Sequence, residues 1–112
     1  MVWQKSMELV RDVYQHTRHW PTEELYGLTS QVRRAAVSVP SNIAEGHGRR
    51  SGREFVRFLN IAHGSLMEVE MQLRIANDLG FLSARDLECM LKTTAEIGRV
   101  LYGLLQSVDT DR

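Results

Sequence analysis

Cysteine is almost absent from this chain, which has one, Cys89, in 112 residues. A single thiol forms no internal disulfide, and no Cys/His set has the spacing of a metal finger. We therefore expect a reducing, cytoplasmic location. A long apolar run and a signal-type start are also lacking, so we expect neither a membrane span nor a secretory leader.

Proline is equally scarce, with two residues against five methionines and many leucines, alanines, glutamates and arginines. This balance favours helix, and strand-like alternation is hard to find. At 43% hydrophobic residues, the chain can bury a core without a metal or a disulfide. We expect residues 1–112 to form a single domain.

Neither sign of charge dominates, because Lys+Arg and Asp+Glu both total 14. The distribution is uneven, however: residues 1–57 carry nine basic and six acidic residues, and residues 58–112 carry five and eight. The imbalance is sharpest over residues 33–57, where the only acids are Glu45 and Glu54. The basic residues there are Arg33, Arg34, Arg49, Arg50, Arg53 and Arg57. Such a local patch matters more for binding a polyanion than the total charge does.

The first helix is predicted over residues 3–17, followed by a connector around Pro21. Its apolar stripe is Trp3, Met7, Val10, Tyr14 and Thr17. We interpret Trp3 and Trp20 as core or interface anchors rather than platforms for base stacking.

The second helix, over about 30–46, has apolar residues on two sides. Val32, Ala36, Val39 and Ile43 share one face, and Val37 and Ala44 project from another. A third, polar stripe consists of Gln31, Arg34, Ser38, Asn42, Glu45 and Arg49. Pro40 falls inside the pattern, so we expect a kink or a break there.

A capping-box pattern predicts the start of the third helix at Ser51 to Glu54, and a similar pattern predicts the start of the fourth at Ser83 to Asp86. The third helix continues to Gly80, with its core face formed by Phe55, Phe58/Leu59, Ala62, Leu66, Val69, Leu73 and Ala76. The seam of the fourth consists of Leu87, Met90/Leu91, Thr94, Ile97, Leu101, Leu104/Leu105 and Val108, after which the tail is expected to fray. Short connections make sequential helices antiparallel neighbours, so the predicted fold is all-α, an up-down-up-down four-helix bundle. We interpret Gly64, beside His63, as the site of a close helix crossing.

One stretch resembles a known family. Residues 31–46 read QVRRAAVSVPSNIAEG, and Gly48-Arg49 follows. This run resembles the signature of bacterial four-helix-bundle proteins encoded in intervening sequences of large-subunit ribosomal RNA genes, which are similar to the accessory protein of diversity-generating retroelements. The resemblance extends to the connector at residues 21–28, the start of the third helix at 54–68 and the turn at 78–82.

The resemblance implies an antiparallel four-helix bundle that assembles as a ring-like homopentamer. It further implies a positively charged surface for DNA or RNA and a polymerase-type protein as partner. The basic residues of the signature, Arg33, Arg34 and Arg49, are all present.

For the six arginines, two interpretations remain open. They line a surface around the second helix and the start of the third that contacts phosphates, or they pair with acids such as Glu45 and Glu54 and solvate the helices. Pro40, Gly46 and the polar residues Ser38, Asn42 and Glu45 are assigned to structure and assembly. We expect Asn42 and Glu45 to bond backbone groups freed by Pro40, or to meet Arg33 or Arg34 of the same or a neighbouring subunit.

Catalysis has little support in the sequence. Ser38 and Cys89 have no evident base, although Glu45 with Asn42 is a possible hydrolase or nuclease pair. His16 and His19 lack a completing carboxylate, so no metal or other cofactor is expected. The preferred hypothesis is a non-enzymatic, oligomeric accessory protein that binds nucleic acid or a nucleic-acid enzyme. The alternative is a protein-interaction module whose arginines form salt bridges between subunits.

Overall fold

The computed structural model describes residues 2–108, which form four long helices and one short 3-10 turn. These are α1 (Val2–Thr17), η1 (Thr22–Glu24), α2 (Leu28–His47), α3 (Gly52–Asp78) and α4 (Ala84–Ser107). Each helix packs against its neighbour in sequence, and α4 closes back on α1. No strand occurs within residues 2–108. The predicted all-α four-helix bundle is confirmed; the predicted fraying of the tail concerns residues 109–112, which lie outside the described part.

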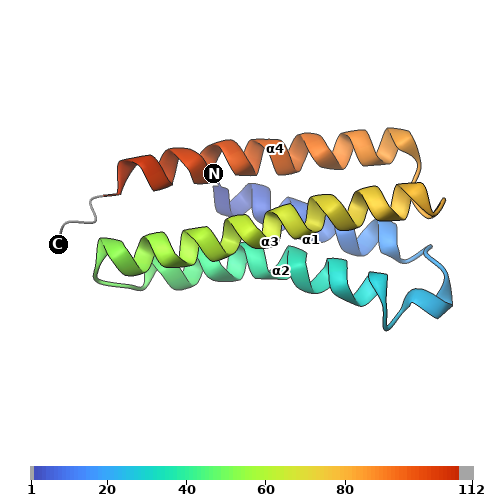
Figure 1. Ribbon diagram of the computed structural model, residues 1–112, viewed down its shortest axis with the longest axis horizontal. Coiled ribbons are helices and arrows are strands. Elements are labelled where there is room, and N and C mark those ends of the chain that lie inside the picture. The colour runs from blue at the N-terminus through green and yellow to red at the C-terminus, as the bar shows by residue number, and fades with distance from the viewer. Residues whose placement is uncertain (1, 109–112) are drawn as a thin grey trace.

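The bundle is elongated, 48 × 25 × 19 Å, and α1 is its shortest helix. The end at which α2 turns into α3 projects beyond the start of α1 (Figure 1). The caps define these elements as predicted: the Ser51 and Ser83 hydroxyls accept hydrogen bonds from the amides of Glu54 and Asp86, each at 3.1 Å. Gly80, with φ of 84°, ends α3, and the amide of Phe81 donates to the Ala76 carbonyl at 2.8 Å.

The predicted core faces of α2, α3 and α4 are largely confirmed. Val32, Ala36, Val39 and Ile43 of α2 are fully buried, as is the α3 row from Leu59 to Ala76. Val37 and Ala44, the second apolar side of α2, remain exposed in the single chain. α2 also runs through buried Pro40 without a break, so a break there was the wrong expectation. Pro40 is held by the packing around it, which outweighs the local cost of a missing amide.

The stripe predicted for α1 is confirmed for Thr17, which is buried, and wrong for Trp3 and Tyr14, while Met7 and Val10 are half-buried. The buried residues are Val2, Ser6, Leu9, Val13 and Thr17, whereas Trp3 is 49% exposed and Tyr14 is 40% exposed. Both the predicted and the buried stripe have helical spacing, and the buried stripe contains two hydroxyl side chains, Ser6 and Thr17. Ser6 and Thr17 donate back to the carbonyls of Val2 and Val13, each at 2.7 Å, and so can be buried without another helix as partner. Trp20 is buried as predicted and lies against Phe81.

The close helix crossing lies at Gly46 and not at Gly64. A methyl group on Gly46 would lie 2.9 Å from the ring of Phe55 and 3.2 Å from Cβ of Phe58, whereas one on Gly64 would meet nothing within 4 Å. Gly64 and His63 are both exposed on α3. The α2–α3 turn is therefore the place where the two backbones need a residue without a side chain.

The two glycines form a matched pair of test positions. Gly46→Ala should lower the free energy of unfolding by about 1–3 kcal/mol, because the added methyl group overpacks the contact with the two phenylalanines. Gly64→Ala should raise it by about 1 kcal/mol, because alanine is the better helix former and the position is open. Urea unfolding followed by circular dichroism measures both. Equal effects at the two positions would contradict this account of the crossing.

Charged side chains join α1 to α4. Lys5 Nζ lies 3.1 Å from Glu96, and His16 Nε2 lies 3.7 Å from Asp86. Between them on α1, burial and then repulsion from Glu8 raise the pKa of the Asp12 carboxyl above its usual range. The folded chain therefore binds this proton more tightly than the unfolded chain, and stability falls as pH rises through the folded pKa.

Replacing Asp12 by asparagine should remove this penalty. Asp12→Asn is expected to raise the thermal midpoint at pH 7, where the native carboxyl is ionised. The difference should vanish near pH 3, where the carboxyl is protonated in both states. Thermal unfolding at the two pH values tests this, with Glu88→Gln on the exposed surface of α4 as control. A midpoint lowered at pH 7 would contradict it.

Candidate functional site

The polar stripe of α2 lies partly against α3. The Ser38 and Ser65 hydroxyl oxygens are 2.7 Å apart, and Asn42 Nδ2 donates to the Ser38 hydroxyl at 2.9 Å and to the Ser38 carbonyl at 2.8 Å. The carbonyl facing Pro40 across one turn is that of Ala36, so the expectation that Asn42 bonds a group freed by proline was wrong. Instead, Asn42 and Ser38 form a hydrogen-bonded link between α2 and α3.

These groups do not form a nucleophilic site. The partners of the Ser38 hydroxyl are a hydroxyl and an amide, and neither can take its proton. Glu45 is exposed and forms an ion pair with Arg49, not with Arg33 or Arg34. Within residues 2–108, no three His, Cys, Asp or Glu side chains lie close enough together to hold a metal ion. The polar residues of the signature therefore act through packing and hydrogen bonding.

The six predicted arginines fall into two groups. Arg33 lies 14 residues before the last residue of α2, His47, a distance of about 21 Å along the helix at 1.5 Å per residue. Arg33 is half-buried: its Nε donates to the Thr17 hydroxyl at 2.8 Å, and its guanidinium lies 4.6 Å from the centre of the Tyr14 ring. Arg33 thus fastens α2 to α1, while the neighbouring Arg34 is exposed.

The other four arginines gather where α2 turns into α3, and we call them the end cluster: Arg49, Arg50, Arg53 and Arg57. Arg49 and Arg57 lie over the Phe58 ring, at 4.9 Å and 5.3 Å from its centre. Arg57 also lies 3.7 Å from Glu54. Pairing with Glu45 and Glu54 was one of the two open interpretations, and it holds for Arg49 and Arg57.

The remaining two members of the end cluster are differently placed. Arg50 and Arg53 are exposed, and within the described residues neither forms an ion pair. A hollow of about 180 Å³ opens beside them at the turn. It is lined by Gly46, His47, Arg49, Arg50, Ser51, Gly52 and Phe55. With four arginines against two glutamates, this end of the bundle carries a positive surplus.

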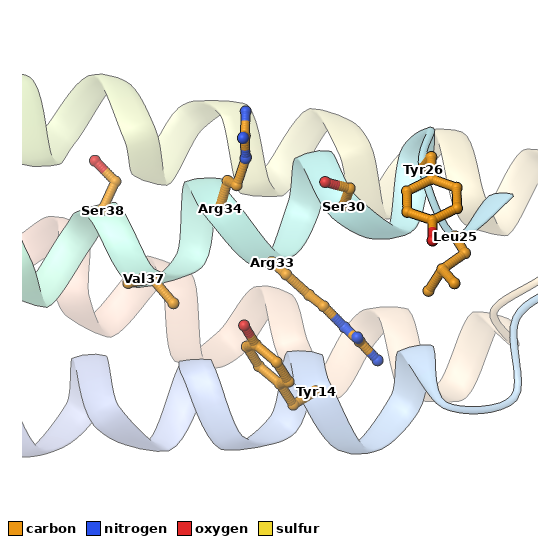
Figure 2. Close-up of a pocket in the computed structure, with 8 residues that line it drawn as sticks. All are labelled: Tyr14, Leu25, Tyr26, Ser30, Arg33, Arg34, Val37 and Ser38. Carbon is orange, nitrogen blue, oxygen red and sulfur yellow. The ribbon is translucent and has the colours of Figure 1, made fainter.

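A larger groove, of about 540 Å³, lies between α1 and the first half of α2, and we call it the α1–α2 groove. Figure 2 shows Val37 and Arg33 pointing from α2 toward α1, where Tyr14 lies, with Leu25 and Tyr26 at one end. The full lining is Tyr14, Leu25, Tyr26, Ser30, Arg33, Arg34, Val37 and Ser38. It contains two arginines and no carboxylate. The Tyr26 side chain is 94% exposed.

Sequence reasoning found only part of this groove. The separate apolar side of α2 was the signal for Val37, but Tyr14 was assigned to the core and the connector residues Leu25 and Tyr26 carried no periodic pattern. Their position depends on η1, which brings the connector back over α2. No described helix combines the length and the apolar character needed to cross a membrane.

Comparison with known proteins places the chain in a family. The sequence profile of the 23S rRNA-intervening sequence protein family matches residues 1–103. A solved structure, described as a protein of unknown function from the S23 ribosomal protein family of Bacteroides thetaiotaomicron, superposes with a TM-score of 0.85. At 24% identity, that match covers 96% of this chain and 100% of the other, and it supports the fold. No curated protein matches. The chain belongs to the 23S rRNA-intervening sequence protein family.

Proposed function

We propose that this protein is a non-enzymatic, oligomeric accessory protein that binds nucleic acid, or an enzyme acting on nucleic acid, through the end cluster. The observation that carries the proposal is the meeting of four arginines at one end of the bundle, with Arg50 and Arg53 exposed and outside the ion pairs of this end. Guanidinium groups contact phosphate oxygens by charge and by paired donors.

The composition of the end cluster favours backbone contacts over base recognition. Phe58, the aromatic ring between its arginines, is already covered by Arg49 and Arg57. Arginines that contact phosphates carry no sequence information by themselves. Binding should therefore be weakly sequence-dependent and strongly dependent on salt.

Oligomerisation is part of the proposal because one neutral chain offers few charges. Trp3, Tyr14, Val37 and Tyr26 leave apolar surface uncovered on the α1 and α2 side of the single chain. Covering it with other copies would repeat the end cluster around one assembly and strengthen polyanion binding by multivalency. A homopentamer and a polymerase-type partner are expectations from the family resemblance, and a cytoplasmic location is an expectation from the scarcity of cysteine; we include all three in the proposal.

A second function is favoured by the other two arginines. Arg33 and Arg34 line the α1–α2 groove, about 20 Å along α2 from the end of the helix at which the end cluster begins, at 1.5 Å of rise per residue. In this alternative the chain is a protein-interaction module whose arginines serve contacts between subunits, with no role for nucleic acid. The absence of any salt-dependent polyanion binding would favour it.

The test is to replace Arg50 and Arg53 together by alanine, which removes exposed charge without breaking an ion pair within the described chain. Titration of single- and double-stranded DNA and RNA at several salt concentrations should show weaker binding. The slope of log K against log salt should become shallower by about 1.8 per chain on duplex DNA, for two lost phosphate contacts. Arg85→Ala with Arg99→Ala, two exposed arginines of α4, is the control. Equal slopes for the two double variants would refute the proposal that the end cluster binds the polyanion.

A further inference from the structure

A row of apolar side chains runs along the outer surface of α3, and we call it the α3 stripe: Met67, Met71, Ile75 and Leu79. They recur every four residues and so share one side of the helix. The buried residues of α3, such as Val69, Leu73 and Ala76, occupy the opposite side. Met71, at the middle of the row, is 58% exposed. No other element of the described chain covers this row.

The charges beside the α3 stripe are mainly acidic. Glu68 and Asp78 are exposed and lie next to its members in sequence, and Arg74 is the basic residue among them. Methionine side chains are flexible and polarisable, which suits them to an interface that must adapt to a partner. The stripe is thus an apolar surface bordered by carboxylates.

The α1–α2 groove has the opposite character. Its apolar part is formed by Tyr14, Leu25, Tyr26 and Val37, and its charged groups are Arg33 and Arg34, without a carboxylate in the lining. Among the uncovered apolar surfaces of the described chain, these two lie on different helices and differ in charge. The groove is a hollow with two arginines, and the α3 stripe is a row of side chains beside two carboxylates and one arginine.

We propose that the α1–α2 groove of one copy binds the α3 stripe of a second copy, in a head-to-tail contact. This inference rests on the proposed function in one respect, that the protein is an oligomer, and it names the surfaces that meet. Pairing two grooves across a two-fold axis would instead set Arg33 and Arg34 of one copy against the same residues of the other. Like charges at an interface oppose such pairing. Beside the stripe, the two carboxylates of Glu68 and Asp78 outnumber the guanidinium of Arg74, and Asp78 lies outside the hollow that Glu68 lines together with Arg34 of its own chain, so the mixed pairing is favoured.

Head-to-tail contact has a geometric consequence. Each copy uses its groove for one neighbour and its stripe for the other, so the contacts continue until a ring closes or a filament grows. When the contacts close into a ring, every groove and every stripe is buried. The end cluster belongs to neither surface and remains exposed after assembly.

Two variants separate this arrangement from the alternatives. The groove variant carries Tyr26→Asp and Val37→Asp, and the stripe variant carries Met67→Asp and Met71→Asp; all four side chains are at least 40% exposed in the single chain. Far-UV circular dichroism checks that both fold. Sedimentation velocity should show the parent as an oligomer and each variant alone as a monomer. Mixed in equal amounts, the two should form a heterodimer and nothing larger, because one intact groove meets one intact stripe.

The control variant carries Val100→Asp and Tyr102→Asp, two exposed apolar residues of α4 outside both surfaces, and should assemble like the parent. If the stripe variant alone still forms dimers, grooves pair with grooves and the inference is overturned. Dimers of the groove variant alone overturn it in favour of paired stripes. If the parent is an oligomer but the mixture stays monomeric, the inference fails while the proposed oligomer stands. A monomeric parent would refute the oligomer itself.

Discussion

The close contact between α2 and α3 determines where the functional side chains of this bundle lie. Gly46 allows the α2 backbone to approach Phe55 and Phe58, and the Ser38–Ser65 contact ties the same two helices about two turns earlier along α2. Because the helices meet so closely, the turn between them is short and its arginines cannot spread apart. The guanidinium groups of Arg49 and Arg57 then lie over one phenylalanine ring. The positive end of the molecule is a result of this packing.

The signature of residues 31–46 serves several physical purposes within one helix. Val32, Ala36, Val39 and Ile43 fill the core, Ser38 and Asn42 join α3, and Arg33 joins α1 through Thr17 and Tyr14. The exposed side of the helix is mixed: Val37 and Ala44 are apolar, and Gln31, Arg34, Ser41, Glu45 and His47 are polar or charged.

Much of the fold could be predicted from the sequence, because periodicity and caps act locally. Ser51, Ser83 and Gly80 mark helix ends through bonds to residues a few positions away, and leucine and alanine at regular intervals mark α3 and α4. The errors arose at positions whose burial depends on contacts between helices. The buried side of α1 includes Ser6, whose hydroxyl donates to a carbonyl of its own helix, and so it has a less apolar pattern than the exposed side with Trp3 and Tyr14. Similarly, the position of Phe55 distinguishes Gly46 from Gly64. Likewise, the sequence predicted that six arginines lie near one another, whereas in the folded chain Arg33 and Arg34 lie apart from the other four.

The position of the end cluster at one extremity of an elongated bundle gives any cyclic assembly a polarity. Rotation about a single axis keeps equivalent points in one plane, so where the long axis of the bundle runs along that axis, every α2–α3 turn lies on the same rim of the ring. The turns between α1 and α2 and between α3 and α4 are at the other end of the bundle (Figure 1). Such a ring has two chemically different faces, and a polyanion attracted to one of them would leave the opposite face open to a second macromolecule.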